Sequence, residues 1–287
     1  AESGGIGASF SAKGRIDDVQ DVSGYLIFSG KALARNSKAL TQLLKDVYTG
    51  VRFDEKDRIR EIIAQVRARR EQAVTGSGHA LAMGAAAQGL SAGSWLTFRL
   101  GGLAGIRGTK ELDKSLKDDQ ALAEFCASLA ALHDKIRNQH RQFLLIGEDG
   151  QLAPMLDDLK SCWQGDSGRT GDAWAMAPVN YSTREAWLTS TQVNFCAKAY
   201  STVAVDHPDA AALTVLGGFL RNGFLHRAIR EKGGAYGGGA GQDSVNGVFR
   251  FFSYRDPRLA ETLDDFDGAL NWLRTENHDA QSLEEAI

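Results

Sequence analysis

Two extended stretches, and the one-sided helices that follow them, limit the folds open to this chain. Residues 6–13 and 22–29 alternate small and apolar side chains around a charged turn, which predicts a pair of strands. Residues 36–48 and the segment that starts at Asp54 then place apolar side chains three to four positions apart, which predicts amphipathic helices. Strands followed by helices of this kind favour an α+β fold.

The second half of the chain shows the same order. Residues 185–205 are rich in Thr, Val and Phe and predict strands, and residues 213–228 predict a helix with one apolar face. The pieces 235–240 and 247–254, joined by a polar loop, predict a hairpin, and 257–273 predict a further amphipathic helix. The expected inner face of the 213–228 helix consists of Leu213, Leu216, Leu220, Phe224 and Ala228.

The remainder of the first half predicts one mixed domain. Residues 76–89 and 118–138 predict helices, 142–146 a strand and 154–163 a closing helix.

The segment QGDSGRTGDAWAMAP clusters Gly, Ser, Asp and Pro between structured stretches and predicts a linker, 165–178. It separates two expected domains, 1–164 and 179–287, which are related mixed α/β units. The chain has no initiator Met, and its last helix, near Ser282, ends without a capping residue. We therefore expect an excised piece whose second domain is incomplete at its C-terminus.

Charge and composition restrict the partners. The 33 Lys and Arg against 36 Asp and Glu leave a formal charge of -3, which gives no reason to expect a nucleic-acid or membrane partner. The chain has no run of roughly 18 apolar residues, and AESGGIGASF lacks a signal pattern. A soluble protein of the cytoplasm is expected, with an organelle matrix as the alternative. The odd number of cysteines, Cys126, Cys162 and Cys196, predicts reduced thiols.

Several catalytic and cofactor motifs are missing. No two histidines form HExxH or the inverted HxxEH, so no zinc site is expected in this chain. KGGAYGGGAGQ follows a predicted helix rather than preceding one, and GIRGTK has Gly-Thr-Lys where a phosphate loop needs Gly-Lys-Ser/Thr, so nucleotide binding is disfavoured. No GxSxG elbow is present. The histidines are His79, His133, His140, His207, His226 and His278.

The segment IREKGGAY leaves two interpretations open from its residues alone. Arg230 in the last turn of a helix is favoured by the helix dipole, Gly233 and Gly234 suit a helix end, and Tyr236 is a common strand residue. Alternatively, Arg230 and Tyr236 are two donors that bind a substrate beside a glycine break.

The runs FLHRAIREKGGAYGGGAG and FRFFSYRDP, with GSGHALAMGAAA upstream, resemble the C-terminal half of the pitrilysin/insulinase family of zinc metallopeptidases, in its presequence-protease branch. The resemblance covers most of the chain. It implies four related α+β domains, of which this chain holds the third and an incomplete fourth, with zinc bound by HxxEH in the N-terminal half.

The resemblance also implies a function. The C-terminal half encloses an unstructured peptide and supplies an Arg and a Tyr near the metal; by motif these are Arg230 and Tyr236, with Gly233 and Gly234 as structural support. The implied partners are the catalytic N-terminal half of the same polypeptide and the peptide, and this chain alone is not an enzyme. The alternative is a non-catalytic scaffold that binds peptides or a partner, as in processing-peptidase-like proteins.

Overall fold

The computed structural model describes residues 3–164 and 175–287, and these form two compact units. The described residues of the first unit are 3–11, 24–63 and 113–164, and those of the second are 12–23, 64–112 and 175–287. The expected domains follow the order of the chain, whereas the units follow packing, so the domain boundaries stay a prediction. Of the expected linker, residues 165–174 lie outside the described residues, and 175–178 form neither helix nor strand.

The helices and strands confirm a mixed α and β structure. In chain order they are β1 (Ile6–Gly14), β2 (Val22–Gly30), η1 (Ala34–Asn36), α1 (Ser37–Thr49), α2 (Lys56–Gly76), α3 (Gly78–Ala87), α4 (Ala92–Leu100), α5 (Leu103–Ser115), α6 (Asp119–Arg137), α7 (Asp149–Cys162), β3 (Ala197–Ser201), α8 (Ala210–Leu220), η2 (Arg221–Lys232), β4 (Gly237–Asp243), β5 (Val248–Tyr254), α9 (Ala260–Thr275) and α10 (Ala280–Glu284).

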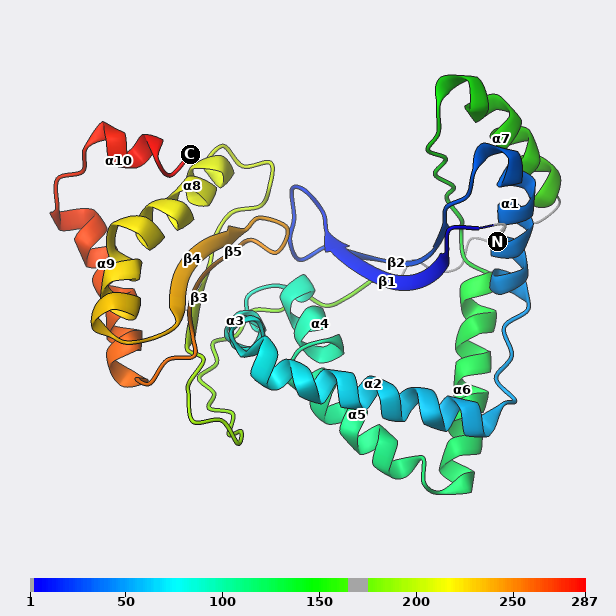
Figure 1. Cartoon of the computed structure of the whole chain (residues 1–287), viewed down its shortest axis with the longest axis horizontal. Coiled ribbons are helices and arrows are strands. Elements are labelled where there is room, and N and C mark those ends of the chain that lie inside the picture. Colours follow the sequence, from blue (N-terminus) through cyan, green and yellow to red (C-terminus); the bar gives the residue numbers. More distant parts are fainter. Residues whose placement is uncertain (1–2, 165–174) are drawn as a thin grey trace. The chain divides into compact units, whose positions relative to one another are not determined.

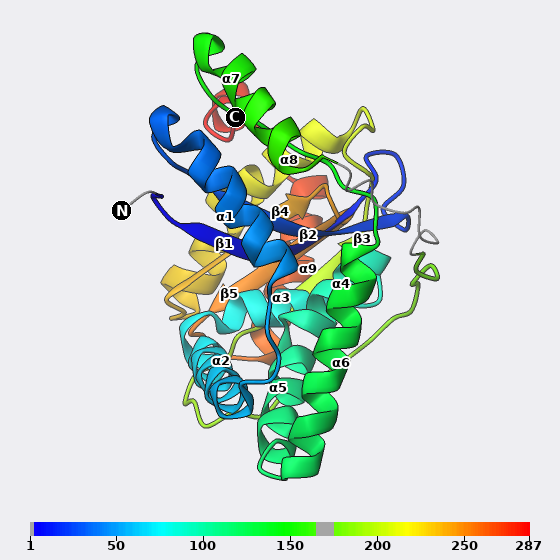
Figure 2. The same cartoon turned by 90° about the vertical axis from the view of Figure 1, so that its right-hand side faces the viewer.

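The first unit packs around the C-terminal end of α1. Helices α1 and α7 lie side by side in both views (Figures 1 and 2). Tyr48, 5% exposed, donates a hydrogen bond from its hydroxyl to the carbonyl oxygen of Arg137 over 3.0 Å. The ring of Tyr48 lies 5.6 Å from Phe28 and 5.4 Å from Trp163. Tyr48 thus joins β2, α1 and the ends of α6 and α7.

The second unit is built on an antiparallel sheet with strand order β3-β5-β4. Helices α8 and α9 and the π-helix η2 contact one face of this sheet, and α3 contacts the other (Figure 1). Alternation along β5 explains the two layers. Phe251 points to the α9 side, where its ring lies 5.6 Å from Phe266, whereas Phe252 and Tyr254 reach His79 of α3.

The buried face of the long helix differs from the expected one. The fully buried residues are Leu220, Leu225 and Ile229, whereas Phe224 and Ala228 are only half-buried. The cause is the change from α to π winding at Arg221, because the wider turn moves the inward position one residue further along the chain.

Two of the expected strand regions are wrong in whole or in part. Residues 142–146 form no strand: Leu144 is 84% exposed and Ile146 82% exposed, and without a partner strand the backbone has no ladder to join. Within 185–205 only β3 is a strand, since Leu188 and its neighbours are exposed and unpaired in the described part of the chain.

Candidate functional site

Arg230 and Tyr236 stand on either side of a glycine turn that ends η2. The N–H of Gly234 donates to the carbonyl oxygen of Arg230, and the N–H of Ala235 donates to that of Ile229, each over 3.1 Å. Gly234 has φ +78°, a left-handed conformation that L side chains rarely adopt. The glycine therefore turns the chain sharply from η2 toward β4.

Gly233 is required by a close approach rather than by its backbone angle. A Cβ there would collide with the guanidinium group of Arg258, which lies against this residue. Arg258 is in turn held by the carboxylate of Asp265 at 2.9 Å and by the carbonyl oxygen of Ala228 at 3.3 Å. This arrangement ties the end of η2 to the start of α9.

The side chain of Arg230 is exposed at the last turn of η2. The segments 3–164 and 175–287 contain no hydrogen-bond or ion-pair partner for its guanidinium group. The electrostatic benefit of a cation at a helix C-terminus applies to this position, and so does availability to a ligand. The structure therefore leaves both interpretations of Arg230 open.

Tyr236 immediately precedes β4 and is 69% exposed. Its N–H donates to the carbonyl oxygen of Arg255 over 3.3 Å, which pairs this residue with the end of β5. Its hydroxyl group has no hydrogen-bond partner within the described part of the chain. A phenol so exposed, on a fixed backbone, is available to donate to a ligand.

The ring of Tyr236 contacts one further aromatic ring, which the sequence pattern did not single out. Tyr254 lies 5.6 Å from it in an edge-to-face arrangement, and His79 lies 4.9 Å from Tyr254 on the other side. The period-two alternation of FRFFSY would have placed Tyr254 opposite the core face, but nothing in the sequence indicates that α3 lies against it.

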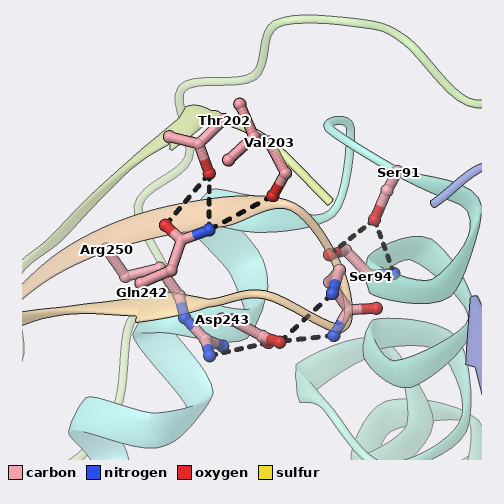
Figure 3. Close-up of polar contacts among 8 residues, drawn as sticks. Ser91, Ser94, Thr202, Val203, Gln242, Asp243 and Arg250 are labelled. Carbon is pink, nitrogen blue, oxygen red and sulfur yellow. Dashed lines mark hydrogen bonds and ion pairs between the residues drawn. The ribbon is translucent and has the colours of Figure 1, made fainter. Parts of the chain in front are cut away.

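The far end of the β4–β5 hairpin is fixed by a polar network (Figure 3). Asp243 accepts a hydrogen bond from Arg250 over 2.7 Å and another from the side-chain amide of Asn246 over 2.9 Å. The amide of Gln242 lies within hydrogen-bond distance of the Thr202 hydroxyl, at 2.9 Å. These contacts secure the hairpin at the end opposite Tyr236.

Neither metal nor phosphate chemistry finds a site in the described part of the chain. No group of three or more His, Cys, Asp or Glu side chains could hold a metal ion in residues 3–164 and 175–287. GIRGTK lies inside helix α5, so its amides are engaged in the helix rather than arranged as a phosphate loop. Cys126 and Cys196 are buried and Cys162 is half-buried, all as free thiols.

The helices were compared with the dimensions of a bilayer as well. None of those in the described ranges combines the length and the apolar character that a membrane span requires.

Two family models match this chain. The model of the region associated with peptidases of family M16, subfamily C, matches residues 1–112, and the model described as "PreP C-terminal domain" matches residues 184–287. The second match contains Arg230, Tyr236 and Tyr254, and the first contains His79.

Individual relatives carry one kind of name. "Presequence protease 1, chloroplastic/mitochondrial" of Arabidopsis thaliana is 31% identical over 268 residues, which cover 91% of this chain and 24% of that protein. The mitochondrial presequence protease of Drosophila melanogaster is 30% identical over 281 residues, covering 94% and 26%. That of Danio rerio is 28% identical over 302 residues, covering 94% and 29%. The chain thus spans about a quarter of the length of these relatives.

Proposed function

Because this chain belongs to the presequence-protease branch of the M16 peptidases, as part of their C-terminal region, we propose that it helps to enclose an unstructured peptide and supplies two donors to the active site. The observation that supports this most directly is the pair of exposed donors, Arg230 and Tyr236, fixed on either side of the glycine turn. The relatives are about four times longer, which supports a catalytic N-terminal half in the same polypeptide.

Zinc belongs to this proposal only through the other half. The residues that the structure describes do not fit a zinc site, because they contain no cluster of ligands. We therefore assign the metal of the proposed zinc metalloendopeptidase to the N-terminal half.

Tyr236 is proposed to stabilise charge on the substrate. When a peptide bond is hydrolysed, negative charge develops on the carbonyl oxygen, and a phenol donor aimed at that oxygen gains strength as the charge grows. The unpartnered hydroxyl of Tyr236 suits this role, since it need not give up a hydrogen bond within the described part of the chain to bind the substrate.

Arg230 is proposed to hold a substrate carbonyl oxygen. Its guanidinium group offers several donors in a fixed fork, and its charge persists at any pH at which the protein is folded. Because this contact exists in both the ground state and the transition state, Arg230 contributes to binding as well as to turnover.

The compartment is part of the proposal. The names of the relatives place those proteins in mitochondria and chloroplasts, which supports the organelle-matrix alternative over the cytoplasm.

Steady-state kinetics of the full-length peptidase on a quenched flexible peptide test both roles. Tyr236→Phe should lower kcat by about 100-fold or more, because it removes one donor and keeps the ring. Arg230→Ala should raise KM and lower kcat together. Arg227→Ala, an exposed arginine on the same helix, is the control and should change neither constant.

The outcome separates a peptidase role from the alternatives. Unchanged kcat and kcat/KM in both variants would mean that Arg230 and Tyr236 only complete the helix end and the strand. Peptide binding that is retained without any cleavage by the full-length protein would instead favour the non-catalytic scaffold.

A further inference from the structure

The exposed ring of Tyr236 needs something to fix its direction. A tyrosine side chain turns about two bonds, and this one is 69% exposed, so most of its surface faces solvent rather than neighbouring atoms. The hydrogen bond from its N–H to Arg255 fixes the backbone but leaves the side-chain rotamer free. The ring contact with Tyr254, at 5.6 Å and 80°, is the interaction that can select one rotamer.

Tyr254 is itself held on several sides. His79 of α3 meets it edge to face at 4.9 Å, and Phe195 lies 5.7 Å away. The guanidinium group of Arg255 lies 5.4 Å from the same ring. Tyr254 is therefore a fixed surface against which a mobile ring can rest.

His79 is well placed to fix Tyr254 by packing. Its ring also lies 5.5 Å from Phe252, the neighbour of Tyr254 on the same face of β5. Its Nδ1 atom is buried and has no hydrogen-bond partner in the described ranges, so ring contacts rather than a hydrogen bond hold this side. Gly78 allows the approach, because a Cβ there would overlap the ring of Phe195.

We propose that Tyr254, backed by His79, is a positioning residue that directs the hydroxyl group of Tyr236 toward the substrate. The inference rests on the proposed function, and it adds a route by which α3 acts on the site from the 1–112 match. An edge-to-face ring pair favours one arrangement by about 2- to 10-fold, and catalysis is sensitive to displacements of about 1 Å.

Kinetics of the full-length peptidase on a quenched peptide test the proposal. Tyr254→Leu removes the ring and should lower kcat by about 10-fold while KM changes by less than about 2-fold. Tyr254→Phe keeps the ring and should stay within about 2-fold of the parent. His79→Ala should lower kcat by about 3-fold, and His79→Phe should restore it by replacing the lost ring.

A double-mutant cycle distinguishes positioning from general structural damage. With Tyr236→Phe present there is no hydroxyl to direct, so adding Tyr254→Leu should cause no further loss of kcat. An additional loss in that background as large as in the parent would overturn the proposal, because Tyr254 would then act independently of Tyr236.

The remaining outcomes also decide the matter. If Tyr236→Phe slows the enzyme while Tyr254→Leu and His79→Ala leave kcat unchanged, the positioning role is wrong and the proposed function stands. If Tyr236→Phe itself has no effect, both fail. Thermal melts accompany each variant, and should Tyr254→Leu not fold, His79→Ala in the parent and Tyr236→Phe backgrounds completes the same cycle.

Discussion

At the scale of single residues, the glycines around the site differ in what they do. Gly234 has φ +78°, whereas Gly237 has no positive φ, and a Cβ added there meets nothing within 4 Å. Gly234→Ala should therefore cost about 1 to 2 kcal/mol of stability, because an L side chain is forced into the left-handed region. Gly237→Ala is the matched control and should be neutral or slightly stabilising. Chemical denaturation of both variants measures the difference, and equal stabilities would show that the turn at Gly234 tolerates a side chain.

The Cys196 thiol gives a second prediction at this scale, for pH. It is 3% exposed, and burial raises its pKa, with the charge of Asp256 acting in the same direction. A raised pKa favours the protonated thiol in the folded state, so the stability contributed is complete below the ordinary thiol pKa and is lost as pH rises above it. Thermal melts across the alkaline range should show this decline, and Cys196→Ala should make it shallower. An identical decline in the variant would assign it to other groups, such as Tyr200, whose pKa burial also raises.

At the scale of elements, short-range patterns predicted much of the structure. The strands expected at 6–13 and 22–29 match β1 and β2 closely, and the helix expected over 118–138 matches α6, whose N-cap Asp118 accepts from the N–H of Ala121. Failures occurred where a partner decides the outcome. Residues 142–146 have strand-like side chains but no partner strand, and no single-sequence pattern marks the change to π winding in η2.

The π winding makes its own prediction. In a continuous α-helix the inward positions would be Phe224 and Ala228, whereas the structure buries Leu225 and Ile229 completely. Leu225→Ala should cost about 2 to 5 kcal/mol, as expected for a leucine removed from a packed core. Phe224→Ala should cost less, because its ring is only half-buried. Denaturant unfolding of the two variants compares them, and a greater loss for Phe224→Ala would return the helix to the α register.

At the scale of the whole molecule, the site was found by a different kind of evidence from the fold. Arg230 and Tyr236 were singled out through resemblance, since their residue types alone are equally consistent with a helix end and a strand. Their family is confirmed, and their roles stay predictions. The support from His79 was out of reach, because Tyr254 lies far along the chain and only the packing of α3 on β5 brings the two rings together.

The division of labour between the two halves gives the last prediction. The sequence contains neither HExxH nor HxxEH, so the purified chain should bind no stoichiometric zinc and should not cleave a flexible peptide by itself. A full-length parent should contain about one zinc per chain and lose activity with a chelator, because its other half holds the metal. Metal analysis after dialysis, run beside a quenched-peptide assay on both proteins, makes the comparison. About one zinc retained by this chain, together with chelator-sensitive cleavage, would show that distant residues assemble a site, and Arg230 and Tyr236 would then need to be placed relative to that metal instead.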